Sequence, residues 1–148
     1  MHRLVPLLAA PLLAFAPAVA PSASDLRVVR LDPDPVAPGG TTAVHAFVAN
    51  GGPDTTASPF TVLVDLPAGF TAEGPFFPSG CTAAPAGRLV SCTFPAGLPR
   101  YRTATALVPV RADANVPPGS SAEGHVQVLS ADHRDPADDR TAFTLSVS

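Results

Sequence analysis

Tryptophan and lysine are absent from the 148-residue sequence, tyrosine and methionine occur once each, and cysteine occurs twice. With the exception of 8 Phe, the apolar residues are mostly small ones such as Ala, Val and Leu. Hydrophobic residues nevertheless make up 46% of the chain, which is enough for one packed domain. This composition favours closely packed strands over a large cavity for an aromatic ligand.

Strong charge is also lacking, because the formal net charge is −3 and every basic residue is Arg. This balance is too mild to draw the chain onto DNA or an anionic membrane, so we expect no nucleic-acid partner. No long apolar stretch with a helical period follows residue 20. The 19 prolines, far above the usual frequency of about 5%, favour short elements with stiff connections.

The first twenty residues have the pattern of an export signal. Arg3 supplies a positive start, residues 4–16 are apolar, and Ala18-Val19-Ala20 is a small-x-small cleavage pattern. An uncleaved membrane anchor is the alternative. It is disfavoured because the apolar run is interrupted by prolines and is shorter than the ~20 residues that span a bilayer.

The cleavage site sets the start of the mature domain. Pro21 should hinder a cut directly before it, so we expect cleavage near Ser22 or Ala23. The expected organisation is a signal peptide over residues 1–23 and a single domain over residues 24–148. After cleavage we expect no stable membrane insertion.

Short alternating segments dominate the rest of the chain. Between residues 41 and 49, for example, Thr42, Val44, Ala46 and Val48 fall on one face, which is the signature of a half-buried strand. Similar segments lie at residues 25–31, 59–66, 70–77, 88–94, 103–111, 122–129 and 141–147. The sequence therefore predicts an all-β, immunoglobulin-like antiparallel β-sandwich of seven or eight strands.

Prolines mark two irregularities in this pattern. Residues 32–40 are rich in proline and glycine and should form an extended edge that leads into a turn. Pro109 lies on the outward face of its segment and indicates a sheet edge or a bulge.

Cys81 and Cys92 are expected to form one disulfide, because paired cysteines in exported chains usually do. Such a short loop gives an estimated stabilisation of about 3 kcal/mol. A redox or metal-binding thiol pair is the alternative, but the spacing is not CxxC and the expected compartment is oxidising.

Four turn motifs and their order resemble a known family. They are Val48-Ala49-Asn50-Gly51-Gly52-Pro53-Asp54-Thr55, Leu66-Pro67-Ala68-Gly69-Phe70, the cysteine segments Ser79-Gly80-Cys81 and Val90-Ser91-Cys92-Thr93, and Asp135-Pro136-Ala137-Asp138-Asp139. The chain is similar to the bacterial "domain of unknown function 11" repeat. The resemblance implies an immunoglobulin-like β-sandwich of secreted and cell-surface proteins, with aspartates here in place of the family's final two asparagines.

The densest acidic cluster is a candidate calcium site. It comprises Asp132, Asp135, Asp138 and Asp139. Calcium prefers several carboxylate oxygens, which loops between strands can supply. Interleaved arginines would partly neutralise the cluster, so a solvated loop with Asp side chains bonded to its own backbone is the favoured interpretation.

Other residues give weaker signals for a site. His45 and His125 fall on expected outward faces and would form a metal pair only if strand register brought them together. Ser79 and Ser91 flank the cysteines without a positioned base. No GxSxG, HExxH or phosphate-binding glycine loop is present, so we expect no catalytic residues and no cofactor.

These observations predict a secreted, non-catalytic module with a structural or interaction role, whose partner is a cell-envelope component or another secreted protein. Contact would use an exposed edge strand or the loop Asn50–Ser58, because loops often carry binding residues. A calcium- or carbohydrate-binding extracellular module is the alternative. A small hydrolase or inhibitor has no motif to support it.

Overall fold

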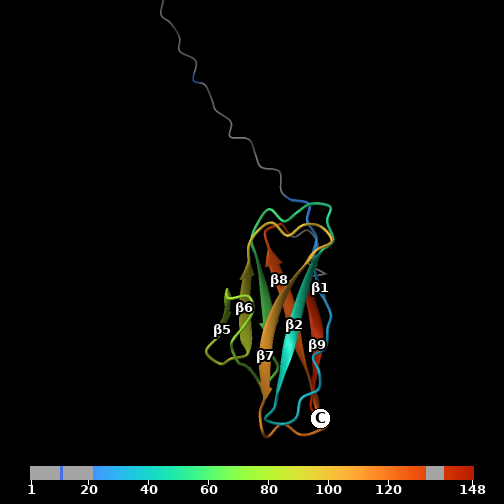
Figure 1. Ribbon diagram of the computed structural model, residues 1–148, viewed down its shortest axis with the longest axis vertical. Helices are drawn as coiled ribbons and strands as arrows, with labels where there is room; N and C mark the ends of the chain where they lie inside the picture. The colour runs from blue at the N-terminus through green and yellow to red at the C-terminus, as the bar shows by residue number, and fades with distance from the viewer. Residues whose placement is uncertain (1–10, 12–21, 133–138) are drawn as a thin grey trace, which may run out of the picture.

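The computed structural model describes residue 11, residues 22–132 and residues 139–148, and over these ranges it contains strands and no helix. The strands are β1 (Leu26–Val29), β2 (Thr41–Asn50), β3 (Phe60–Asp65), β4 (Phe70–Ala72), β5 (Cys81–Ala83), β6 (Leu89–Phe94), β7 (Thr103–Ala112), β8 (Ser121–Ser130) and β9 (Arg140–Ser146). They form two antiparallel sheets, with the orders β1-β2-β7-β4 and β5-β6-β3-β8-β9, packed face to face (Figure 1). The predicted immunoglobulin-like β-sandwich is confirmed.

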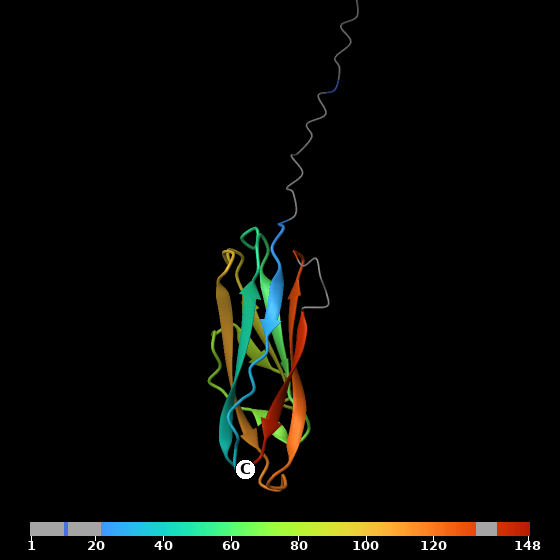
Figure 2. The same cartoon turned by 90° about the vertical axis from the view of Figure 1, so that its right-hand side faces the viewer.

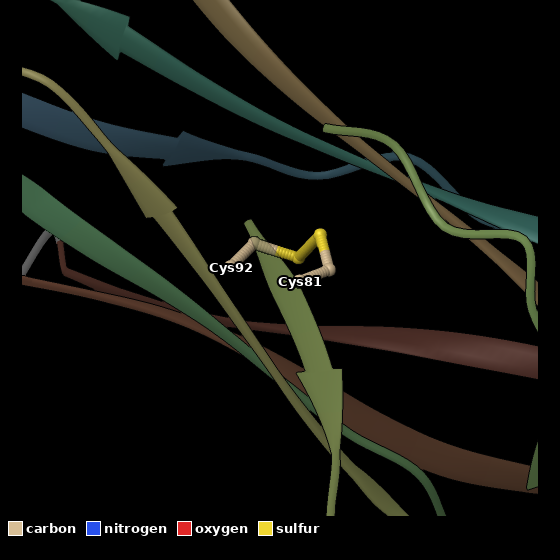
Figure 3. The surroundings of a disulfide bond; sticks show 2 residues. All are labelled: Cys81 and Cys92. Atoms are coloured by element: carbon tan, nitrogen blue, oxygen red, sulfur yellow. A yellow bond between two sulfur atoms is a disulfide. The ribbon is translucent and has the colours of Figure 1, made fainter. Parts of the chain in front are cut away.

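The described chain has nine strands, where the sequence predicts seven or eight. The additional strand is β5, whose three residues are too few to show a period-2 pattern. Cys81 lies directly opposite Cys92 on β6, with 3.9 Å between the two Cα atoms, and the two are joined by a disulfide (Figure 3). The predicted disulfide is therefore confirmed, and it fastens β5 to the sheet.

The core follows the predicted alternation. Val44, Ala46 and Val48 of β2 are at most 1% exposed, and β2 pairs with β7 so that Val44 lies beside Val108 and Ala46 beside Ala106. Small side chains allow the two sheets to pack closely, and each fully buried valine contributes roughly 1.5–3 kcal/mol relative to an exposed one. The apolar faces of these strands are thereby buried between the two sheets.

The proline-rich segment after β1 runs along the outer edge of β9. Val36 donates from its nitrogen to the carbonyl of Ser146 at 2.9 Å and accepts from the nitrogen of Ser148 at 2.9 Å. Asp32 Oδ1 accepts from the backbone nitrogen of Thr144, also at 2.9 Å. The predicted extended edge is confirmed, and it covers a strand edge that would otherwise be open to pairing.

Pro109 lies where the edge of the other sheet bulges. Its carbonyl accepts from the nitrogen of Glu73 at 2.9 Å, and Phe77 exchanges two hydrogen bonds with Leu107. Residues 74–76 therefore lie between these two points of contact and leave the ladder. Because Pro109 has no N–H to donate there, the bulge costs no hydrogen bond, and the predicted edge or bulge is confirmed.

The remaining edges are covered or short. The nitrogen of Ala72 in β4 donates to the carbonyl of Gly87, and Thr141 Oγ1 of β9 donates to the carbonyl of Val28 in β1 at 3.5 Å. Figure 2 shows β1 and β9 lying side by side where the two sheets meet. Little free strand is thus left for an edge contact. Within the residues described, no helix is long and apolar enough to cross a bilayer.

Candidate interaction site at the loop end

Asn50, the last residue of β2, organises one end of the sandwich. Its side chain is buried, with 1% of the residue exposed. Its Oδ1 accepts from the backbone nitrogens of Gly52 at 2.9 Å and Asp25 at 3.2 Å. Its Nδ2 donates to the carbonyls of Asp54 at 2.8 Å and Leu98 at 2.9 Å. One side chain therefore ties its own loop both to the start of the domain and to the segment before β7.

Thr56 fastens the same two loops a second time. Its Oγ1 accepts from the nitrogens of Gly97 at 3.0 Å and Leu98 at 2.9 Å. Its backbone nitrogen donates to the carbonyl of Leu98 at 3.1 Å, and its carbonyl accepts from Gly97 at 3.0 Å. Because Thr56 is only 3% exposed, these bonds are shielded from water and hold the loops rigidly.

Asp132, from the predicted acidic cluster, is also a buried polar residue at this end. Its Oδ2 accepts from the nitrogens of Ala57 at 2.8 Å and Ser58 at 2.9 Å, and the residue is 7% exposed. The prediction of a solvated loop whose aspartates bond their own backbone is therefore wrong for Asp132, which is buried and holds the backbone of a distant loop.

The other aspartates of the cluster are not brought together in the described structure. Asp135 and Asp138 lie outside the described residues, and Asp139 adjoins β9, where its carbonyl accepts from Val128. Over the residues described there is no group of three or more metal-ligating side chains. The calcium hypothesis stays a prediction.

We call residues 50–58, residues 95–102 and Asp132 the loop end, which is the upper end of the molecule in Figure 1. The predicted contact loop Asn50–Ser58 uses its two buried polar side chains, Asn50 and Thr56, to hold backbone. The loop is therefore chiefly a scaffold. The large exposed side chains of the loop end come from residues 95–102.

Tyr101 is the most exposed large hydrophobic side chain among the described residues, at 76%. Its φ is +62°, and it is the one described residue other than glycine with a positive φ. Arg102 donates from its nitrogen to the carbonyl of Pro99 at 3.3 Å, so Tyr101 occupies the third position of a turn of the type II pattern, normally a glycine position. The nitrogen of Tyr101 donates to the carbonyl of Asn50 at 2.7 Å, which locks this conformation.

Arg100 lies over the Tyr101 ring, with 5.0 Å between its guanidinium carbon and the ring centroid. Sequence reasoning missed this pair because Pro-Arg-Tyr-Arg contains no glycine to mark the turn. The available signal was that Tyr101 is the one tyrosine in the sequence and stands between two arginines.

Beside this turn the two sheets leave an apolar crevice of about 200 Å³. Phe60 and Phe94, whose rings stack with centroids 5.2 Å apart, form one wall, and Leu98, Pro99 and Ala104 form another. The crevice and the turn share Pro99, so they belong to one surface.

The weaker candidates do not form a site in the described structure. His45 is on β2 and His125 on β8, in different sheets, so the hypothesis of a pair across one sheet is wrong. Ser91 is on β6, opposite Leu63 of β3 and Thr82 of β5. Ser79 lies in the segment before β5. These neighbours give neither serine a base.

The shifted pKa values belong to exposed groups away from the loop end. The hydrogen bond from the Thr144 backbone lowers the pKa of Asp32, and Arg30 contributes. The hydrogen bond from Arg111 lowers the pKa of Glu73, and Glu73 in turn raises the pKa of Arg111. These shifts describe ordinary surface pairing and do not point to a catalytic acid or base.

No protein-family model matches the chain, and no curated protein matches it. Solved structures do. A chain of the CaDoc0917–CaCohA2 complex is 14% identical with a TM-score of 0.52, over 83% of this chain and 99% of that chain. The collagen-binding domain of a Staphylococcus aureus adhesin is 9% identical with a TM-score of 0.51, over 86% of this chain and 99% of that chain.

A third solved structure is part of a larger protein. BcpA, the major pilin subunit of Bacillus cereus, is 12% identical with a TM-score of 0.56 over 84% of this chain, but the match covers 38% of the pilin. At these identities the likeness shows a shared fold. The chain is therefore similar in architecture to these three β-sandwich structures.

Proposed function

We propose that this chain is an exported, non-catalytic module that binds a cell-envelope component or another secreted protein through its loop end. The observation that carries the proposal is that Tyr101 has a positive φ and an exposed ring. A bulky residue in the left-handed region costs roughly 1–2 kcal/mol, yet its ring is 76% exposed and adds little to the core. Tyr and Arg are also the residue types most enriched at binding hot spots.

Other observations support the location and the class. A disulfide persists in an oxidising compartment, in agreement with the expected export signal. The similar solved structures are named as part of a complex, as a collagen-binding domain and as a pilin subunit, which supports an interaction role. Kinship with the "domain of unknown function 11" repeat is part of the same proposal. It is supported by the bonds of Asn50, which account for the asparagine in that turn motif.

The test is an array of secreted proteins and envelope polymers probed with the disulfide-intact domain. Three forms are compared: the natural chain, Tyr101→Ala and Phe77→Ala. Phe77 is a matched control because it is an exposed aromatic, at 60%, outside the loop end. We expect a target that binds the natural chain and the control but not Tyr101→Ala. An array with no target, or a target that binds all three equally, would overturn the proposal.

A further inference from the structure

Two arginines flank the exposed tyrosine. Arg100 and Arg102 are the charged residues between residues 94 and 107, and both are exposed. Neither forms an ion pair with any residue that the structure describes. On a chain with a net charge of −3, this turn is a local positive site next to the crevice. It therefore favours a partner group of negative charge.

The crevice is too small for an ordinary small-molecule ligand. Its volume of about 200 Å³ lies below the roughly 300–1,000 Å³ of typical ligand pockets. Its lining, which includes Phe60, Phe94 and Leu98, contains no charged side chain. It suits one apolar side chain of a protein partner.

We infer that the loop end binds a short peptide segment in which an apolar residue stands beside a carboxylate. The apolar side chain enters the crevice, the carboxylate pairs with Arg100 or Arg102, and Tyr101 covers the segment between them. This inference rests on the proposed function and adds the chemistry of the partner. A sugar fits less well, because Arg100 already occupies a face of the Tyr101 ring and the crevice offers few polar groups.

The first experiment selects ligands from a phage-displayed library of short random peptides on the immobilised, disulfide-intact domain. The expected result is enrichment of peptides with Leu, Phe or Met next to Asp or Glu. A synthetic peptide from the enriched set is then titrated by fluorescence anisotropy. Added salt should weaken its binding, because the attraction between exposed opposite charges falls as the Debye length shortens from about 10 Å at 0.1 M to about 3 Å at 1 M.

Matched variants separate the two parts of the site. Arg100→Gln with Arg102→Gln should raise the Kd of the peptide roughly threefold to tenfold and remove most of the salt dependence. Ala96 is an exposed residue of the crevice lining. Ala96→Leu should fill the crevice with a larger side chain and weaken binding at least about tenfold. Arg140→Gln and Ala114→Leu make the same chemical changes at exposed positions outside the loop end and should leave the Kd unchanged.

The outcomes distinguish this inference from the proposed function. Enriched peptides that need Tyr101 but show no acidic residue would overturn the inference and leave the proposed function standing. If the peptide library shows no enrichment but the protein array yields a target, the inference is likewise overturned and the proposed function stands. If the library and the array both yield nothing, both proposals fail.

Discussion

The side-chain nitrogen of Asn50 donates to the carbonyl of Leu98 at 2.9 Å, which joins the end of β2 to a loop 48 residues further along the chain. The carbonyl of Asn50 also accepts from the nitrogen of Tyr101 at 2.7 Å. The buried asparagine and the exposed tyrosine therefore belong to one unit. The rigidity of the scaffold lets the domain hold an aromatic side chain outside its core at a fixed place.

Replacing Asn50 with alanine should destabilise the domain by about 3 kcal/mol or more. The change leaves the nitrogens of Gly52 and Asp25 and the carbonyl of Asp54 without their partner, at a cost of about 1–3 kcal/mol for each such group that is buried. Urea unfolding followed by circular dichroism measures the effect. The matched control is Asn115→Ala at an exposed turn position, which should change stability by less than about 0.5 kcal/mol. Equal effects of the two changes would contradict the role assigned to Asn50.

Replacing both Cys81 and Cys92 with alanine should lower the free energy of unfolding by about 2–4 kcal/mol, because the disulfide joins two residues that are 11 positions apart and so restricts the unfolded chain. The measurement is urea unfolding with and without a thiol reductant. The natural chain should lose stability when reduced, whereas the double variant should not respond. Titration of free thiols in the unfolded, unreduced protein should find none, and two reactive thiols would refute the disulfide.

Gly124→Ala should destabilise the domain by about 1–3 kcal/mol through overpacking. Gly124 lies in the middle of β8, and a Cβ added there would lie 2.7 Å from the carbonyl oxygen of Asp65 and closer still to the ring of Phe143. Gly74→Ala is the control, because the nearest atom to its added Cβ is 3.8 Å away. Thermal unfolding should show a lower Tm for Gly124→Ala alone. Equal melting of both variants would contradict the close contact of Gly124 with Asp65 and Phe143 on the strands that flank β8.

Sequence reasoning found the strands that alternate over several residues, such as the segment around Val44 to Val48, because period 2 is a local property. It missed β5, whose pairing through Cys81 depends on β6 rather than on its own pattern. It also missed Tyr101, since a positive φ at a non-glycine residue is imposed by the distant Asn50. The candidate site thus depends on contacts between remote segments, which a single sequence does not display.

Stability should fall at acid pH in part through Asp32 and Glu73. Their pKa values are lowered on folding from 3.8 and 4.5, so their contribution is present above those values and is lost as the pH falls through the folded values. Urea midpoints measured between about pH 7 and about pH 2 should therefore decline less for Asp32→Asn with Glu73→Gln than for the natural chain.

The control for the pH series is Asp34→Asn with Asp113→Asn, which removes the same charge at exposed positions. Its acid decline should match that of the natural chain. A decline equally shallow in both double variants would assign the effect to net charge rather than to the Thr144 and Arg111 hydrogen bonds.

Tyr101→Gly should raise stability while it removes binding. Glycine adopts a φ of +62° without the steric cost of a side chain, so the free energy of unfolding should rise by roughly 0.5–1 kcal/mol. The loss of the Arg100 contact offsets part of this gain. Urea unfolding measures the first effect, and anisotropy with the selected peptide measures the second. If the ring instead stabilised the fold, Tyr101→Gly would lower the free energy of unfolding. A Tyr101→Gly variant that is less stable and still binds the peptide would therefore contradict the role in binding.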